Sequence, residues 1–209
     1  MDANTARFLL VLILAGGALG MVIATSVVPS WIVNTGTVDD ERLRTLIGLW
    51  RVCFDLDGKK TQCASIYGHP DESIEDVPPS WRSAETCSIL SAICLWLGLL
   101  SALVVQCCCC IPPLTPQRSA VIFILPKSFL AAGACFTGAT GVSVVAYYSE
   151  LFCEIIVCEL GTMFYMCWAA TGAAIMASIL CHFHFNALTL ERHRLGPQLL
   201  ETQEVVNYP

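Results

Sequence analysis

The sequence predicts an all-α membrane protein with four transmembrane helices and one long, folded loop. Apolar residues make up 56% of the chain and charged residues only 13%, whereas a typical soluble domain carries about 25% charged residues. Four stretches contain no charged side chain: residues 8–28, 86–106, 128–148 and 160–185. A helix needs about 20 apolar residues to cross the hydrocarbon core of a bilayer. Because all four stretches are long enough, we favour membrane spans over buried helices of a soluble core.

The first stretch follows a short N-terminal segment, residues 1–7. An apolar run after Arg7 could also belong to a cleaved signal peptide, but the apolar part of a signal peptide is only about 7–15 residues long. We therefore expect residues 8–28 to remain as the first transmembrane helix. Gly16 and Gly20 have the GxxxG spacing that lets membrane helices approach closely.

Residues 29–85, between the first two spans, have the composition of a folded domain because they include many large apolar side chains, which linkers lack. Residues 54–58, Phe-Asp-Leu-Asp-Gly, alternate apolar and polar side chains and end in an Asp-Gly turn signal, which predicts a hairpin. Cys53 and Cys63 are the only cysteines in this loop. A bridge between them would pin the two strands and stabilise the loop by about 3 kcal/mol. Two free thiols or a metal site are the alternatives, although the hairpin has no histidine to complete a metal site.

The second span, residues 86–106, leads into a connection, residues 107–127, that begins with four adjacent cysteines. Cysteines at the end of a transmembrane helix are sites of reversible palmitoylation. The candidate acylation sites are Cys107, Cys108, Cys109 and Cys110, together with Cys181 near the end of the fourth span. In a protein that already spans the bilayer, acylation would change helix tilt or lateral sorting.

The cysteines also predict the orientation of the chain. Disulfides belong to oxidising compartments, and palmitoylation of juxtamembrane cysteines occurs on the cytosolic side. We therefore expect residues 29–85 and 149–159 to lie outside the cell. Both termini, residues 107–127 and the tail of residues 186–209 would then lie in the cytoplasm. The distribution of Lys and Arg does not decide the matter, because the long loop is near the length at which the positive-inside rule fades.

Two groups of residues, far apart in the sequence, form recognisable signatures. The loop pattern comprises Trp31, Gly48, Leu49, Trp50, Cys53, Cys63 and Arg82. The second pattern leads into the fourth span and comprises Glu159, Gly161, Tyr165 and Trp168, the last followed by Ala-Ala-Thr-Gly. The loop pattern resembles the signature of the claudin family, and the second pattern is similar to the ELG…Y…WAASG pattern of claudins. The resemblance covers about residues 8–185. Peripheral myelin proteins and calcium-channel gamma subunits share the loop pattern but match the second one less well.

The resemblance implies a left-handed four-helix transmembrane bundle with a small extracellular antiparallel β-sheet built from both extracellular segments. Trp31, Gly48, Leu49, Trp50 and Arg82 would anchor the loop to the bundle. Claudins associate side by side in one membrane and pair across the gap between cells, where they seal the paracellular route or form charge-selective pores. The implied partners are the lipid bilayer and other copies of this chain or of similar proteins, in cis and in trans, at cell–cell junctions of the plasma membrane.

Acidic residues outnumber basic residues in the long loop. A path lined by carboxylates concentrates cations and excludes anions, whereas the simpler explanation is a solvated surface. Since the pore charges of claudins cluster near the hairpin, the resemblance makes Asp55 and Asp57 the candidate pore residues. We expect any paracellular pore to prefer cations.

Some features depart from the claudin pattern. Cys153 and Cys158 lie in the second extracellular segment, where claudins usually have no cysteine; they would form a second bridge or remain as thiols for another subunit. Residues 207–209, Asn-Tyr-Pro, replace the Tyr-Val end with which claudins bind scaffold PDZ domains. Residues 48–51, Gly-Leu-Trp-Arg, also occur in gamma-type proteins, so the alternative function is that of an auxiliary subunit of a membrane channel or receptor.

Catalysis, a cofactor and nucleic-acid binding find no support in the sequence. It contains no Gly-x-Ser-x-Gly motif and no phosphate-binding loop. Residues 181–184, Cys-His-Phe-His, include metal-binding types, but a cluster at a helix end is more often interfacial packing, so no metal is expected. A net charge of −6 argues against nucleic acid as a partner. The four spans have no ionisable residue at mid-depth, which argues against a proton relay.

Overall fold

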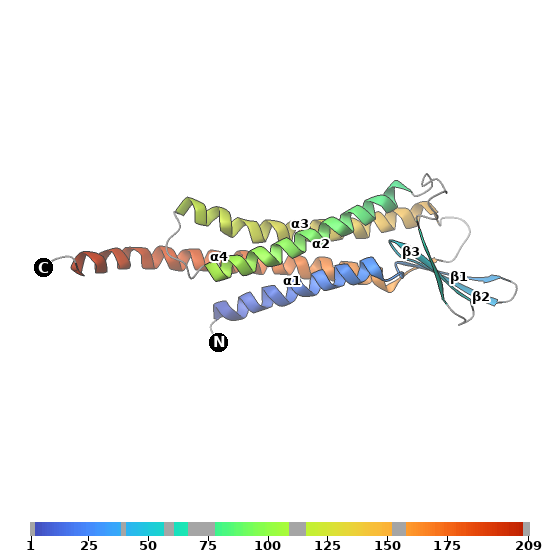
Figure 1. Cartoon of the computed structure of the whole chain (residues 1–209), viewed down its shortest axis with the longest axis horizontal. Helices are drawn as coiled ribbons and strands as arrows, with labels where there is room; N and C mark the ends of the chain where they lie inside the picture. Colours follow the sequence, from blue (N-terminus) through green and yellow to red (C-terminus); the bar gives the residue numbers. More distant parts are fainter. Residues whose placement is uncertain are drawn as a thin grey trace.

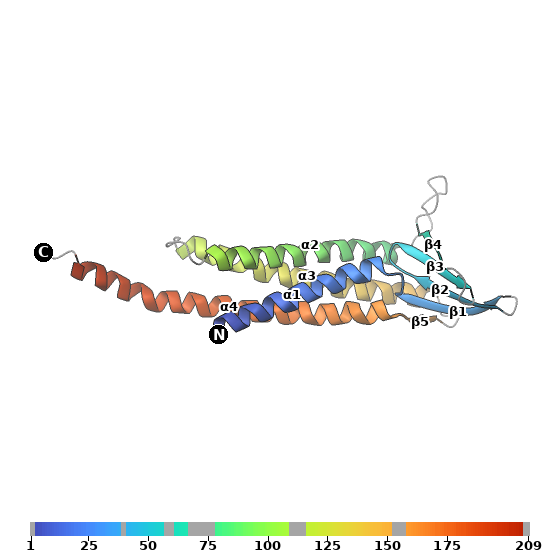
Figure 2. The ribbon, with the colours of Figure 1, turned by 60° about the horizontal axis from the view of Figure 1, so that its bottom comes forward.

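The computed structural model describes residues 3–38, 41–56, 61–66, 78–108, 116–151 and 158–206. In this part of the chain, four long helices form a bundle and a five-stranded sheet covers one end of it (Figure 1). The helices are α1 (Ala3–Val27), α2 (Pro79–Cys108), α3 (Pro116–Leu151) and α4 (Thr162–Val206). Figures 1 and 2 show that α1 begins and α4 ends on the side of the bundle away from the sheet.

All four helices are long and apolar enough to cross a membrane. Their apolar portions are Ala3–Val27, Pro79–Cys107, Phe123–Ser149 and Thr162–Leu190. The prediction of four helices of spanning length is therefore confirmed. The fourth helix begins later than expected, because Leu160 pairs as a strand with Ile32 and only Thr162 starts the helix. At its other end α4 continues to Val206, so the predicted tail is helical for most of its length.

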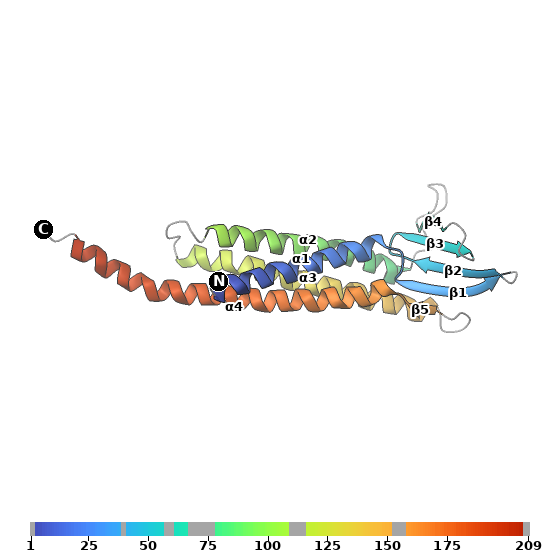
Figure 3. The same ribbon diagram turned by 90° about the horizontal axis from the view of Figure 1, so that it is seen from below.

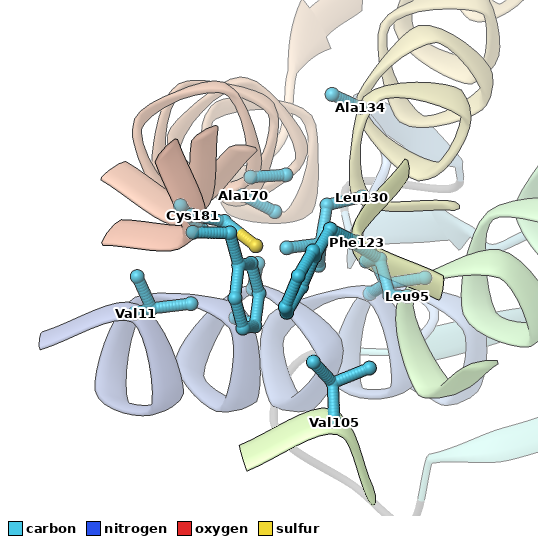
Figure 4. Close-up of a cluster of buried hydrophobic side chains, with 14 residues drawn as sticks. Val11, Leu95, Val105, Phe123, Leu130, Ala134, Ala170 and Cys181 are labelled. Carbon is cyan, nitrogen blue, oxygen red and sulfur yellow. The ribbon is translucent and has the colours of Figure 1, made fainter. Parts of the chain in front are cut away.

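The core of the bundle consists largely of small side chains, which let the helix backbones approach one another. α1 contributes Ala15 and Ala18, and α4 contributes Ala170, Ala174 and Ala177, all of them completely buried. Figure 4 shows larger members of this core converging from α1, α2 and α3, namely Val11, Leu95, Val105, Phe123 and Leu130, beside Cys181 of α4.

The predicted role of Gly16 and Gly20 in bundle packing is wrong. A Cβ atom at either position would have no neighbour within 4 Å. The helix turns Ala15 and Ala18 toward the core instead, and the two glycines lie on a face that has no partner among the described residues.

α2 and α3 interlock through two reciprocal contacts between leucine and glycine. A Cβ atom at Gly133 would lie 2.8 Å from Leu95, and one at Gly98 would lie 2.9 Å from Leu130. Each leucine therefore fills the space that a side chain on the facing helix would need. Leu95 and Leu130 are completely buried as a result.

The sheet is antiparallel throughout and has the order β4-β3-β2-β1-β5 (Figure 3). Its strands are β1 (Ile32–Val38), β2 (Glu41–Ile47), β3 (Arg51–Leu56), β4 (Gln62–Ser65) and β5 (Cys158–Leu160). The first four come from the loop between α1 and α2, and β5 comes from the connection between α3 and α4. The expectation that both segments build one small antiparallel sheet is therefore confirmed.

Candidate functional site

The hairpin of β3 and β4 carries the predicted disulfide. Cys53 and Cys63 stand directly opposite each other in the sheet register and are bonded, with their Cα atoms 4.0 Å apart. The predicted hairpin and its bridge are thus confirmed. Asp57, the second candidate pore residue, and Gly58, which were expected to form the turn, lie outside the described residues.

Trp31 connects three parts of the molecule. Its indole Nε1 donates a hydrogen bond to the carbonyl oxygen of Thr25, 2.6 Å away in the last turns of α1. Its backbone N–H donates to Ile47 of β2 at 2.9 Å, and its carbonyl accepts from the N–H of Gly161 at 2.7 Å. Because the side chain is completely buried, these bonds are shielded from solvent and fix the start of the sheet on the bundle.

The Gly-Leu-Trp segment forms the tight connection between β2 and β3. The N–H of Gly48 donates to the carbonyl of Arg51 at 2.8 Å, and a Cβ atom at Gly48 would lie only 2.5 Å from the Cα of Pro29. Only glycine permits this approach of two backbones. Leu49 is completely buried, and the half-buried Trp50 accepts a backbone hydrogen bond from Ile66 at 3.2 Å.

Leu49 of this connection belongs to a second hydrophobic cluster, which we call the junction core. Its buried members are Trp31, Ile32, Leu49, Trp81, Ala84, Val144, Phe164 and Cys167. They come from the sheet and from α2, α3 and α4. The cluster thus attaches the sheet to three of the four helices.

Trp81 is a member of the junction core that the sequence signature did not include. Its Nε1 donates to the carbonyl oxygen of Leu49 at 3.2 Å, and the centroid of its ring lies 4.6 Å from the ring centroid of Tyr147. The position of a large aromatic residue at the start of the second helix, next to the signature residue Arg82, was the available signal. Val144 and Phe164 had no such signal, because they lie within uniformly apolar stretches.

Several predicted signature residues are exposed rather than buried in the junction core. Arg82 is exposed on the first turn of α2, and Glu159 is exposed on β5, opposite Val33. Trp168 is 43% exposed on α4, where its indole packs so closely on Gly141 that a Cβ atom there would lie 3.2 Å from Cε2. The signature therefore combines anchoring residues with residues that face outward.

The candidate pore residue Asp55 has a basic neighbour. The register pairs Asp55 of β3 with Arg44 of β2, and directly opposed residues of antiparallel strands project from the same face of the sheet. Arg51 and Glu159 fall on that face by the same alternation. Among the described side chains, this face therefore carries opposite charges side by side rather than a cluster of carboxylates.

The predicted acylation sites differ in accessibility. Cys107 is exposed near the end of α2, whereas Cys181 is only 1% exposed and packs in the bundle core. Acylation of Cys181 is contradicted, because a transferase cannot reach a thiol enclosed by helices and the acyl chain would not fit there. The side chain of Cys108, and all of Cys109 and Cys110, lie outside the described residues.

The predicted pairing of Cys153 with Cys158 lies only in part within the described residues. Cys158 begins β5, where its backbone pairs with Asn34. The side chain of Cys158 and the whole of Cys153 lie outside the described residues, so this second bridge stays a prediction.

The two histidines near the end of α4 have different surroundings. His182 is exposed, and its Nε2 lies 2.9 Å from Nδ2 of Asn186. His184 is buried, and its Nε2 lies 3.0 Å from Oε1 of Gln106 on α2. Over the described ranges, no three His, Cys, Asp or Glu side chains are grouped so that they could hold a metal ion.

The sheet projects from a base that backbone hydrogen bonds and the junction core hold in place. The strands β1 and β2 extend away from the bundle (Figure 1), while hydrogen bonds and the junction core fix their inner ends. No protein-family model and no curated protein matches the chain.

Proposed function

We propose that this chain is a claudin-like junction protein of the plasma membrane. It associates with itself or with similar proteins in cis and in trans, and forms a paracellular barrier or a cation-preferring paracellular pore. One observation carries the proposal: Trp31, Gly48, Leu49 and Gly161, which come from both signature patterns, meet where the sheet joins the bundle. Two separate stretches of sequence therefore contribute to the same contact between the sheet and the bundle.

The surface of the bundle supports its placement in a bilayer. Each helix exposes large apolar side chains to its surroundings, for example Ile13, Trp96, Val142 and Ile179. Exposed apolar surface on this scale is unfavourable in water and favourable in lipid. The disulfide of the hairpin belongs to an oxidising compartment. We therefore place the sheet outside the cell and both termini in the cytoplasm.

The outer part of the sheet offers a surface for pairing in trans. Phe54 on β3 is 43% exposed, next to the exposed Gln62 of β4 in the register. Exposed aromatic side chains on a rigid surface are frequent anchors of protein interfaces. We expect Phe54→Ser to weaken trans association, and Gln62→Ser, the matched control on the neighbouring strand, to leave it unchanged.

The proposal is tested by expressing the tagged chain in cells that lack junctions and mixing them with cells that do not express it. Concentration at contacts between two expressing cells, with strands visible by freeze-fracture electron microscopy, would support it. Equal intensity at contacts with non-expressing cells would contradict trans pairing. A uniform distribution that changes only when a channel is co-expressed would favour the auxiliary-subunit alternative.

A further inference from the structure

The outer surface between α3 and α4 contains a groove made of two adjoining hollows. Their volumes are about 400 and 370 Å³, and both are lined by Ala131, Ser178 and Ile179, so they are continuous. One hollow is further lined by polar residues that include Lys127 and His182. The other is lined mainly by small or apolar residues: Ala134, Cys135, Gly138, Thr171 and Ile175.

The groove exists because the α3 residues along it are small. Ala131, Cys135 and Gly138 follow one another at intervals of about one helical turn. A Cβ atom at Gly138 would be in ordinary contact with Thr171, 3.6 Å away, so the helices approach closely beneath the groove. Ile175 and Ile179 of α4 line the same hollow and are each nearly half exposed. The result is a narrow apolar channel on a face that we place in lipid.

The opposite end of the groove is polar and basic. Lys127 is the only charged residue in the sequence from Phe123 to Ser149. Its Nζ donates to Oδ1 of Asn186 at 3.2 Å, and Nδ2 of Asn186 lies 2.9 Å from Nε2 of His182. An ammonium group has three donors, so Lys127 can bind an anion while it keeps its bond to Asn186.

We propose that this groove binds one anionic phospholipid, with an acyl chain along the apolar hollow and the phosphate at Lys127. The inference depends on the proposed orientation, in which the end of the bundle away from the sheet lies in the cytoplasmic leaflet. That leaflet carries the anionic lipids of a plasma membrane. From Lys127 to Gly138 the helix rises about 16 Å, which matches the depth of roughly 15 Å of one leaflet.

A transmembrane helix of a second copy fits the groove less well. By sequence, the four candidate spans contain a single acidic residue, Glu85, and it lies near the sheet end of α2. The membrane-spanning part of a helix from another copy would therefore bring no carboxylate to Lys127. An anionic headgroup supplies that negative charge. A flexible acyl chain has no fixed shape of its own and can therefore adapt to a narrow groove.

Native mass spectrometry of the purified chain in detergent tests the proposal. The probes are dioleoyl phosphatidylserine, dioleoyl phosphatidylcholine and water-soluble glycerophosphoserine, which has the headgroup without the chains. We expect the wild type to retain phosphatidylserine in preference to phosphatidylcholine and not to retain glycerophosphoserine. Lys127→Gln should lower phosphatidylserine retention roughly five- to tenfold, as expected for one basic group near an anionic surface.

Ala131→Phe, which fills the groove at its middle, should reduce retention of both lipids. Arg7→Gln removes an exposed charge on α1, and Ala169→Phe adds a ring at an exposed position of α4 outside the groove. These two controls should bind like the wild type. Melting curves of all four variants establish that each one is folded.

The proposal is overturned if Lys127→Gln retains phosphatidylserine like the wild type, if the controls lose as much lipid as the groove variants, or if glycerophosphoserine binds as well as the lipid. If Ala131→Phe changes the dimer fraction and leaves lipid retention unchanged, a second copy occupies the groove and the lipid proposal is wrong. Each of these results is independent of the cell-contact experiment, which tests the junction function alone.

Discussion

Gly161, which immediately precedes α4, donates its backbone N–H to the carbonyl oxygen of Trp31 across 2.7 Å. This bond joins the segment that follows α1 to the segment that leads into α4. The two positions are far apart in the sequence and belong to the two separate signature patterns. The contact requires a glycine, because a Cβ atom at Gly161 would overlap the carbonyl oxygen of Ser30.

Replacement of Gly161 by alanine is expected to destabilise the protein. The added methyl group cannot fit beside Ser30 without moving the backbone, and overpacking of this kind costs about 1–3 kcal/mol. Thermal unfolding of the purified protein should show a lower Tm. Gly172→Ala, within α4, is the control, because a Cβ atom there meets nothing within 4 Å, and it should raise stability slightly. Equal Tm values for the two variants would contradict the role of Gly161.

Replacement of Trp31 by phenylalanine should separate its hydrogen bond from its packing. The variant keeps most of the apolar ring but leaves the carbonyl of Thr25 without the bond from Nε1, which is 2.6 Å long and buried. We expect a loss of about 1–3 kcal/mol, measured by chemical unfolding in detergent. Trp168→Phe, at a partly exposed indole, should cost less. A larger loss for Trp168→Phe would argue against Trp31 as the anchor.

The interlocked pair of Leu95 and Gly133 predicts energetic coupling between α2 and α3. Gly133→Ala places a methyl group 2.8 Å from the Leu95 side chain and should destabilise the bundle by about 1–3 kcal/mol. Leu95→Ala should cost about 2–5 kcal/mol. Since the smaller side chain makes room for the added methyl group, the double variant should lose less than the sum of the two. Additive losses in this cycle would contradict the interlock.

The pairing of Asp55 with Arg44 predicts opposite effects on ion selectivity. In cell layers that express the chain, Asp55→Asn should lower the ratio of Na⁺ to Cl⁻ permeability, because it removes negative charge from the sheet face. Arg44→Gln should raise the same ratio, because it leaves the Asp55 carboxylate without the neighbouring positive charge. The measurement is a dilution potential across the layer. Unchanged permeability ratios in both variants would show that this face of the sheet does not line the ion path.

The sequence was sufficient to predict the four helices and the bridged hairpin. Both depend on local patterns: uncharged length for the helices, and alternation with paired cysteines for the hairpin. The placement of Leu160 in the fourth helix was wrong, because an apolar residue at the end of such a run has no local preference. Its backbone partner, Ile32, is distant in the sequence.

The direction in which helix side chains point could not be read from the sequence. The helices are apolar on all sides, so there is no polar face to indicate which residues are buried. For that reason Gly16 and Gly20 were expected at a helix contact and Cys181 at an accessible position, whereas a Cβ atom at either glycine would have no neighbour within 4 Å and Cys181 is buried. The pairing of Arg44 with Asp55 could likewise not be predicted, because it depends on the register between β2 and β3.

The central claim is that the sheet lies outside the cell as a disulfide-bridged platform. Intact cells can be treated with a membrane-impermeant maleimide, with or without prior reduction by the impermeant phosphine TCEP. Trypsin then places Cys53 and Cys63 in separate peptides, residues 52–59 and 61–82. We predict that both cysteines are labelled only after TCEP. Labelling without reduction, or only after the cells are permeabilised, would contradict the account.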